Sequence, residues 1–459
     1  GTPAAGGFGE KRKREEETVL IIEGARILDP AAGRDAVGDI VIEGERIRET
    51  RPVGLGREAA RQAGEENCRV IDGRGLAAAP GLVDVHVHFR DPGFTYKEDI
   101  ETGARAAARG GFTTVVCMAN TKPIADNRET LEYVLEKGRK TGIRVLSCAA
   151  ISKGFQGKEL TDMEGLLAAG AAGFTDDGIP LMDGAFVRRA MEEAARLDTV
   201  LSFHEEDKTF IKENGINHGA VSDRLGIYGS PALAENSLVA RDCMIALDTG
   251  ARIDIQHISS GPAVEMVRLA KKLGAQVWAE VTPHHFALTE DAVLAHGSLA
   301  KMNPPLRTER DRQMLIEGLK DGTIDMIATD HAPHSAEEKA RPLTEAPSGI
   351  IGLETALALG ITYLVKPGHL TLLELMKKMS TNPARLYRLE AGSLAAGAPA
   401  DLVLFDPDAR WTVKDFASKS ANSPFVGQTL TGCVVRTICA GREVYAEERR
   451  TGGQNGETV

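Results

Sequence analysis

The central part of the chain alternates between apolar runs of strand length and segments whose apolar residues follow the helical period. Such an alternation is typical of a parallel β-sheet whose strands are linked by crossover helices. It predicts eight strands, at residues 81–89, 113–118, 144–149, 171–176, 200–204, 252–257, 276–281 and 324–329. Eight such units close into an α/β fold, the (β/α)8 TIM-type barrel, whose catalytic residues lie at the carboxyl ends of the strands.

Short strand patterns broken by turn residues flank this central region on both sides. They cover residues 19–28, 39–47 and 69–71 before it, and 401–405 and 434–445 after it. The two flanks can pair into one small β domain built from both chain ends. The predicted organisation is a mobile tail at 1–17, a small β domain at 18–76 plus 395–449, a catalytic barrel at 77–394 and a second mobile tail at 450–459.

Composition and charge narrow the classes of partner. The net charge of −11 over 459 residues argues against nucleic acid and against an anionic membrane, which leaves a small-molecule substrate as the expectation. The six cysteines are scattered without a Cys-x-x-Cys pair. The sequence therefore indicates neither a disulfide framework nor a zinc ribbon, and we expect a reducing, cytoplasmic location. No apolar stretch reaches membrane-spanning length, and the N-terminus lacks the hydrophobic core of a secretory signal.

His86 and His88 stand two positions apart at the end of the first predicted strand. Because residues with this spacing point to the same face of a strand, both imidazoles can bind one metal ion. The alternative is two unrelated histidines at a strand end. Seven strand ends carry ligand-type side chains, which argues against a purely structural explanation. Besides the two histidines, these side chains are Asn120, Asp176, Asp177, His204, His257, His284, His285 and Asp330.

The number of these ligand-type groups bears on the number of metal ions. Four histidines and a carboxylate pair exceed what a single tetrahedral ion uses, so the sequence favours a site for two ions. Zinc is the expected occupant. Imidazole and carboxylate ligands also suit manganese, cobalt or iron, and the sequence leaves that choice open.

Five longer motifs surround the predicted strand ends. They are Asp-Val-His-Val-His-Phe-Arg-Asp-Pro-Gly at 84–93, Met-Ala-Asn-Thr-Lys-Pro at 118–123, Phe-Thr-Asp-Asp-Gly at 174–178, Lys-Met-Asn-Pro-Pro-Leu-Arg at 301–307 and Ala-Thr-Asp-His-Ala-Pro-His at 328–334. Together they resemble the dihydroorotase family, in its bacterial class within the amidohydrolase superfamily, and the similarity runs from about residue 19 to residue 445. The resemblance implies reversible cyclisation of N-carbamoyl-L-aspartate to L-dihydroorotate with loss of water, a step of de novo pyrimidine biosynthesis.

The resemblance also implies a set of metal ligands. One zinc ion would be held by His86, His88 and Asp330, and a second by His204 and His257. Many relatives bridge their metals with a carboxylated lysine on the fourth strand, but this strand contains no lysine. Asp176 and Asp177 stand there instead, and alternation lets only one of them face the barrel mouth. By its match to the motif at 174–178, Asp177 is the expected bridge.

The chemistry follows from such a centre. Metals held by imidazoles and a carboxylate depress the pKa of a bound water enough to provide hydroxide near neutral pH. In the hydrolytic direction, the resemblance implies that this hydroxide attacks the ring amide carbonyl while Asp330 accepts and then delivers a proton. Ring closure reverses these roles.

The implied substrate carries a carboxylate, for which a guanidinium is the natural bidentate partner. Arg90 stands two residues beyond His88, so we expect it on the same strand face; the alternative is a solvent-exposed arginine at a strand end. The resemblance adds Asn120 and His334 to the carboxylate site, Asn303 to the pyrimidine ring, and the backbone at Ser348 and Gly349 to the substrate pocket. For Asn303, a turn-forming role before two prolines is the competing interpretation.

Two further segments lie near these residues. His284 and His285 follow the seventh strand, but the resembled family does not use them as metal ligands, so we expect them to be structural or to support the ligands. The polar segment 331–347 lacks strong periodicity and is expected to form an active-site loop.

Two other functions compete with this interpretation. A hydantoinase or allantoinase acts on a ring without a carboxylate, and Arg90 and the missing fourth-strand lysine argue against it. A non-catalytic subunit that supports aspartate transcarbamoylase would have lost metal ligands, whereas every expected ligand is present. The sequence therefore predicts an active, metal-dependent cyclic amide hydrolase. Association with aspartate transcarbamoylase is an open hypothesis drawn from the resemblance, and we expect a homo-oligomer.

Overall fold

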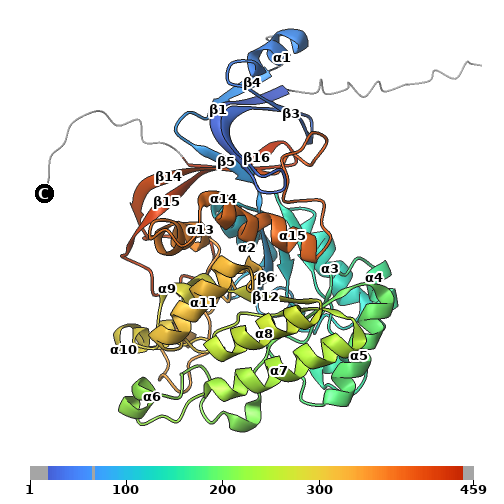
Figure 1. Cartoon of the computed structure of the whole chain (residues 1–459), viewed down its shortest axis with the longest axis vertical. Coiled ribbons are helices and arrows are strands. Elements are labelled where there is room, and N and C mark those ends of the chain that lie inside the picture. Colours follow the sequence, from blue (N-terminus) through green and yellow to red (C-terminus); the bar gives the residue numbers. More distant parts are fainter. Residues whose placement is uncertain (1–18, 65–67, 448–459) are drawn as a thin grey trace, which may run out of the picture.

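The two flanks of the chain meet in one eight-stranded sheet. The computed structural model describes residues 19–64 and 68–447, so both predicted tails lie outside the described residues. The sheet contains β1 (Val19–Asp29), β2 (Arg34–Glu43), β3 (Arg46–Arg51), β4 (Cys68–Asp72), β5 (Ala77–Pro80), β14 (Leu402–Thr412), β15 (Thr429–Cys439) and β16 (Arg442–Ala446). Its order is β16-β15-β14-β5-β1-β2-β3, and β4 also pairs with β1. The antiparallel pair β5–β14 joins the two flanks, which confirms a small β domain formed from both chain ends (Figure 1).

Two segments that the sequence pattern predicts as single strands are hairpins. Residues 39–47 break at a loop of residues 44–45 between β2 and β3, and residues 434–445 break at a loop of residues 440–441 between β15 and β16. Both residues of the second loop have positive φ, 50° and 72°, as a tight type I′ turn requires. A two-residue loop interrupts the apolar alternation so briefly that the pattern does not reveal the break.

Eight parallel strands form the barrel, at the positions that the sequence predicts. They are β6 (Leu82–Val87), β7 (Phe112–Cys117), β8 (Arg144–Ser147), β9 (Phe174–Thr175), β10 (Val200–Phe203), β11 (Arg252–Ile255), β12 (Val277–Val281) and β13 (Met326–Ile327). The first three form one sheet and the other five a second sheet. Single parallel bridges, Ala149 to Phe174 and Val87 to His331, join the two sheets at both edges, so the strands follow one another around a ring. Most strands end one or two residues earlier than predicted.

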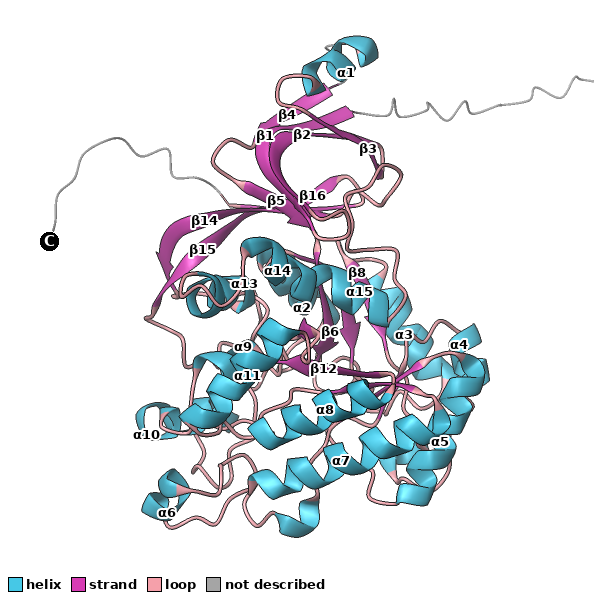
Figure 2. Cartoon of the chain, in the orientation of Figure 1, coloured by secondary structure: helices cyan, strands magenta, loops and turns pink. Residues whose placement is uncertain are grey.

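Helices connect these strands and cover them from outside. They are α1 (Gly56–Ala63) in the small domain, then α2 (Ile100–Arg109), α3 (Arg128–Gly138), α4 (Met163–Ala168), α5 (Gly184–Leu197), α6 (Ala220–Leu225), α7 (Ala232–Thr249), α8 (Gly261–Leu273), α9 (Pro283–Ala287), α10 (Ala292–His296), α11 (Glu309–Asp321), α12 (Ala336–Lys339), α13 (Ala356–Gly360), α14 (Leu372–Met376) and α15 (Asn382–Leu386). Helices α5, α7 and α8 run side by side along one flank (Figure 2). Asp99 and Asp183 fix where α2 and α5 begin, since each side chain accepts a hydrogen bond from a first-turn amide.

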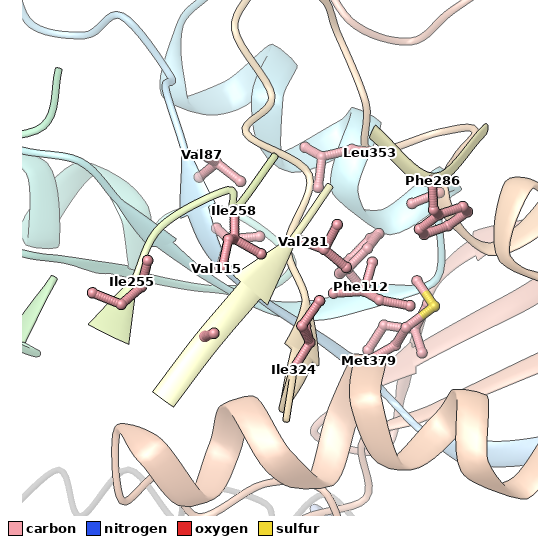
Figure 3. Packing of buried hydrophobic residues seen from close by; sticks show 14 of the residues in the cluster. Val87, Phe112, Val115, Ile255, Ile258, Val281, Phe286, Ile324, Leu353 and Met379 are labelled. Carbon is pink, nitrogen blue, oxygen red and sulfur yellow. The ribbon is translucent and has the colours of Figure 1, made fainter. Parts of the chain in front are cut away.

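Buried apolar side chains fill the space between strands and helices. Val87, Val115 and Val281 come from three barrel strands and lie in one cluster with Phe286 and Met379 (Figure 3). Full burial of such a side chain contributes roughly 1.5–3 kcal/mol. This packing holds the strand ends, and with them the residues that follow each strand. Among the described residues, none of the helices combines the length and the apolar character needed to cross a membrane.

Candidate functional site

Four histidine side chains converge at the carboxyl ends of the barrel strands. His86 lies in β6 and His88 just after it, while His204 directly follows β10 and His257 stands two residues after the end of β11. The ring centroids of His86 and His257 are 5.2 Å apart, and those of His204 and His257 are 4.7 Å apart. All four side chains are buried. Because parallel strands of a barrel end at the same rim, segments far apart in the sequence meet here.

Asp177 lies between the two pairs of histidines. Its Oδ2 is 3.5 Å from Nε2 of His86 and 3.3 Å from Nε2 of His88. Its Oδ1 is 3.5 Å from Nδ1 of His204 and 3.8 Å from Nε2 of His257. Each carboxylate oxygen therefore faces a different pair, which is the arrangement of a carboxylate that bridges two cations.

The neighbouring Asp176 points away from the histidines. Its Oδ1 accepts hydrogen bonds from the backbone amides of Ile151, at 2.7 Å, and Ser152, at 3.0 Å. Alternation along the chain thus directs only one of the two aspartates toward the barrel mouth.

Asp330 completes this cluster on the side of His86 and His88. Its Oδ1 lies 2.9 Å from Nε2 of His88 and 3.3 Å from Nε2 of His86. The Asp330 side chain is 14% exposed, against 4% for Asp177, so Asp330 is the carboxylate more open to the pocket.

The donor atoms of this cluster fit metal ions. Three overlapping groups each place one imidazole or carboxylate atom per residue within 4.8 Å of the others: His86, His88 and Asp177; His86, His257 and Asp330; and Asp177, His204 and His257. Nε2 of His86 and Oδ1 of Asp177 are buried and have no hydrogen-bond partner among the described residues. Buried polar atoms are normally satisfied, so these two atoms suit a cation as their missing partner.

The charge state of the carboxylates supports the same conclusion. Burial alone would raise the pKa of Asp177 and of Asp330, but the surrounding imidazoles outweigh it and hold both pKa values below the usual range of an aspartate. For His204, burial opposes the charge, yet Asp177 and Glu206 outweigh it and raise the pKa to about 10. A negative field of this kind attracts cations.

The other ring nitrogen of three histidines has its own partner. Asn120 Oδ1 lies 2.9 Å from Nδ1 of His88. The carboxylates of Glu280 and Glu206 contact Nδ1 of His86 and Nε2 of His204 in the same way. Such partners fix the ring orientation and the tautomer, so that the remaining nitrogen can face a metal.

Neither glutamate is among the residues that the sequence predicts for the site. Glu206 stands two residues after His204, the spacing that singled out the first histidine pair, and that spacing could have identified it. Glu280 is an acidic residue inside the apolar strand β12 and is fully buried, which is a weaker indication.

A pocket with a volume of about 260 Å³ opens above the cluster. Its lining includes almost every residue that the sequence predicts for the site: His88, Arg90, Asn120, Asp177, His204, His257, Asn303, Asp330, His334, Ser348 and Gly349. His86 lies beneath this lining and is fully buried. Gly178, Asn214 and Ala332 also line the pocket and were not predicted. The structure thus brings the predicted metal ligands and the predicted substrate contacts together.

Arg90 reaches the pocket by a different route from the predicted one. Strand β6 ends at Val87, and Arg90 has a left-handed backbone with φ of 61°, so strand alternation does not orient it. Its Nε donates to the carbonyl of Pro333 at 3.1 Å, and its Nη2 lies 3.3 Å from Nε2 of His334. The turn, and not the strand, places the guanidinium beside His334.

His334 is held as a neutral imidazole. Its Nε2 donates to the carbonyl of Ser348 at 2.8 Å, and its Nδ1 accepts from Lys97 Nζ at 3.2 Å. Burial, together with the cationic groups of Arg90, Lys97 and Lys339, lowers the pKa of His334 to about 2. Near neutral pH, Arg90 is therefore the charged group that this wall offers to an anion.

Asn303 lines the pocket, whereas His284 and His285 are not among its lining residues. Oδ1 of Asn303 is buried without a hydrogen-bond partner among the described residues, although Asn303 lines the pocket. His285 contacts Thr282 Oγ1 through Nδ1 and the carbonyl of Pro304 through Nε2. Neither His284 nor His285 belongs to the three donor groups described above.

Comparison with known proteins agrees with the resemblance seen in the sequence motifs. Residues 75–262 match the dihydro-orotase-like family model, and residues 317–445 match the amidohydrolase family model. The amidohydrolase match and the His/Asp cluster together indicate a divalent metal site. The solved L-hydantoinase (dihydropyrimidinase) of Arthrobacter aurescens superimposes with a TM-score of 0.81 at 24% identity, covering 92% of this chain and 95% of that one. Like this chain, that protein consists of a barrel and a small β domain.

Curated relatives are much closer in sequence. A dihydroorotase of Clostridioides difficile is 57% identical over 427 residues, which cover 93% of this chain and all of the relative. A dihydroorotase of Clostridium acetobutylicum is 50% identical over 433 residues, which cover 94% of this chain and all of the relative. With this identity over nearly the whole length, and with the family model matching the first half of the barrel, the chain belongs to the dihydroorotase family.

Proposed function

We propose that this protein catalyses the reversible cyclisation of N-carbamoyl-L-aspartate to L-dihydroorotate with release of water, in de novo pyrimidine biosynthesis. One observation carries the proposal: Arg90 and His334 line the same pocket as Asp177 and Asp330. A substrate whose carboxylate pairs with the guanidinium can therefore present its amide to the His/Asp cluster. The names of the curated relatives support the same reaction.

In this proposal, Asp330 moves the proton. In the hydrolytic direction its carboxylate accepts a proton from the water that attacks the ring amide, and then delivers it to the departing nitrogen. The opening of Asp330 to the pocket supports this role because the group must reach the substrate, and its lowered pKa means that it starts as an anion. In the direction of ring closure, Asp330 takes a proton from the carbamoyl nitrogen and returns it to the leaving oxygen.

We further propose that two zinc ions occupy the cluster. His86, His88 and Asp330 would hold one ion and His204 and His257 the other, with Asp177 between them; the distances from Asp330 Oδ1 to the first two histidines and the two faces of the Asp177 carboxylate support this assignment. Divalent ions bound there would supply Lewis-acid polarisation of the amide carbonyl and would lower the pKa of water. Elemental analysis of untreated protein should find about two metal ions per chain, with zinc dominant.

The remaining pocket residues would bind the substrate. Arg90 would form the charged contact with the carboxylate, with Asn120 and His334 beside it. Asn303 would accept a hydrogen bond from a ring N–H through its unpartnered Oδ1. The backbone at Ser348 and Gly349, which lines the pocket next to His334, would contact the ring.

Assays with L-dihydroorotate and with hydantoin test the proposal. Hydantoin has the cyclic amide but no carboxylate, so we expect kcat/KM for dihydroorotate to exceed that for hydantoin by at least about tenfold, the loss of one charged hydrogen bond. The hydantoinase fold shared at 24% identity makes this the informative comparison. Turnover of hydantoin alone would end the dihydroorotase assignment.

Several finer points belong to the same proposal. We place the protein in the cytoplasm, as a homo-oligomer that associates with aspartate transcarbamoylase, and we keep the domain limits 18–76 plus 395–449 and 77–394. The barrel limit differs at β5, because Ala77–Pro80 pairs with β1 and β14 and therefore belongs to the sheet of the small domain. Co-elution of the two enzymes at micromolar concentration would support the association, and separate elution would contradict it.

A further inference from the structure

The connection between β14 and β15 reaches from the small β domain to the catalytic barrel. We call residues 417–422 of this connection the strap. Ser418 Oγ and the amide of Lys419 donate to the buried carboxylate of Glu98, and Ser420 Oγ donates to the carbonyl of Lys97. The strap therefore binds the segment that follows the first barrel strand, close to Arg90.

The last residue of the strap, Asn422, uses both its side-chain oxygen and its side-chain nitrogen in hydrogen bonds to the pocket wall that contains His334. Its Oδ1 accepts a hydrogen bond from the amide of His334 at 3.1 Å. Its Nδ2 donates to the carbonyls of Ala332, at 3.0 Å, and Gly349, at 3.1 Å. All three partners line the pocket, whereas Asn422 is buried and does not.

Other buried side chains engage the neighbouring carbonyls of the same wall. Lys301 Nζ donates to the carbonyl of Ala346 at 2.7 Å, and Lys339 Nζ donates to those of Pro347, at 2.8 Å, and Gly349, at 3.0 Å. Because these carbonyl oxygens already accept hydrogen bonds within the protein, they do not face an incoming carboxylate as unpaired acceptors. Asn422 is the member of this set that comes from the small β domain.

We propose that Asn422 is a positioning residue for substrate binding, which fixes His334 and Gly349 relative to Arg90 so that the wall accepts the substrate carboxylate. The inference rests on the proposed function for the identity of the ligand. The small β domain thereby contributes to the binding site through the strap, without touching the substrate.

The hydrogen bonds of Asn422 indicate what its removal should do. The amide of Asn422 joins both ends of the segment 332–349, so its removal frees the carbonyl of Ala332 and the backbone amide of His334 and leaves the carbonyl of Gly349 with Lys339 as its donor. Hydrogen bonds of this kind each change an equilibrium by about tenfold. We expect Asn422→Ala to raise KM for L-dihydroorotate about tenfold while kcat changes less than about threefold, since the wall binds the carboxylate and the cluster performs the chemistry.

The experiment compares Asn422→Ala and Asn422→Asp with the wild type and with Ser423→Ala. The aspartate variant keeps the shape and the acceptor of Asn422 but loses the donor, so it remains informative if the alanine variant folds poorly. Ser423 is a matched control, because it is equally buried and its Oγ only accepts from the amide of Phe425. Each protein is measured for KM, kcat, metal content and amide hydrogen exchange of residues 331–349.

A raised KM in both Asn422 variants, with metal content and kcat retained and with faster exchange in residues 331–349, supports the positioning role. KM within twofold of wild type in both variants overturns it, as does a parallel loss of metal and kcat. The same changes in Ser423→Ala also overturn it, because they would indicate general loosening of the strap. If the wild type does not turn over dihydroorotate, the proposed function fails, and unchanged exchange in residues 331–349 then decides separately against the positioning role.

Discussion

Glu280 contacts Nδ1 of His86, and both side chains are fully buried. The carboxylate also accepts from the backbone amide of His257 at 3.2 Å, so one residue of β12 holds histidines from two other strands. We predict that Glu280→Gln lowers metal affinity by about 10–100-fold, because a neutral amide raises the basicity of the His86 ring less than a carboxylate does. Metal competition with a chelator measures this change. Unaltered affinity would contradict the assignment of Glu280 as a supporting residue.

A second prediction separates the two adjacent aspartates. Asp177→Asn should reduce bound metal and lower kcat by at least about 100-fold, the upper range found for residues that merely support ligands. Asp176→Asn is the matched control, since Asp176 binds only the chain near Ile151 and Ser152. It should keep the metal content while it lowers the melting temperature. Equal metal loss in both variants would argue against Asp177 as the bridge.

Arg90→Met should raise KM for dihydroorotate by about 10–100-fold, the effect of losing one charged hydrogen bond. Metal content should stay at the wild-type level, because Arg90 contacts Pro333 and His334 and none of the donor groups. Steady-state kinetics with elemental analysis measure both quantities. The same variant should lose its preference for dihydroorotate over hydantoin.

Asp330→Ala should lower kcat by about 10²–10⁴-fold, the range of general acid–base catalysis. Substrate affinity should change far less, because Arg90, Asn120 and His334, and not Asp330, are the proposed contacts of the substrate carboxylate. Comparing kcat with the dissociation constant of dihydroorotate measures the two effects separately. Full turnover in this variant would show that another group transfers the proton.

Lys339 should make stability depend on pH. Burial, with Lys301 nearby, lowers its pKa from 10.5 to about 7. Between these two values the unfolded chain binds more protons at this residue than the folded chain, so the free energy of unfolding should rise as the pH increases from about 7 to 10.5. Lys339→Met should lack this rise. Urea denaturation of both proteins at pH 7 and 9.5 tests it, and equal differences at the two pH values would contradict it.

The strand pattern was sufficient to predict the barrel and the residues at its mouth. His86, His204 and His257 were found because parallel strands of a barrel deliver their end residues to one rim, whatever the intervening sequence. Turns were harder. The left-handed backbone of Arg90 and the two-residue hairpin loops leave no trace in apolar periodicity, because each depends on one or two φ angles.

Contacts between distant side chains could not be predicted at all from the pattern. Glu280 supports His86 across the barrel, and Asn422 reaches three residues of the pocket wall from a connection outside it. Each is a single polar residue in its own segment, and its role depends on which other segment packs against it. Only the folded chain supplies that information.

The pairing of β5 with β14 also constrains how the protein is made. Strand β6 begins two residues after β5 ends, so the first barrel strand is tethered to an element whose partner is synthesised more than 300 residues later. A ribosome-bound chain therefore carries β5 with one edge unpaired until Leu402–Thr412 has emerged. We conclude that the nascent protein depends on late translation to cover this edge, and that a prematurely terminated chain exposes it to aggregation.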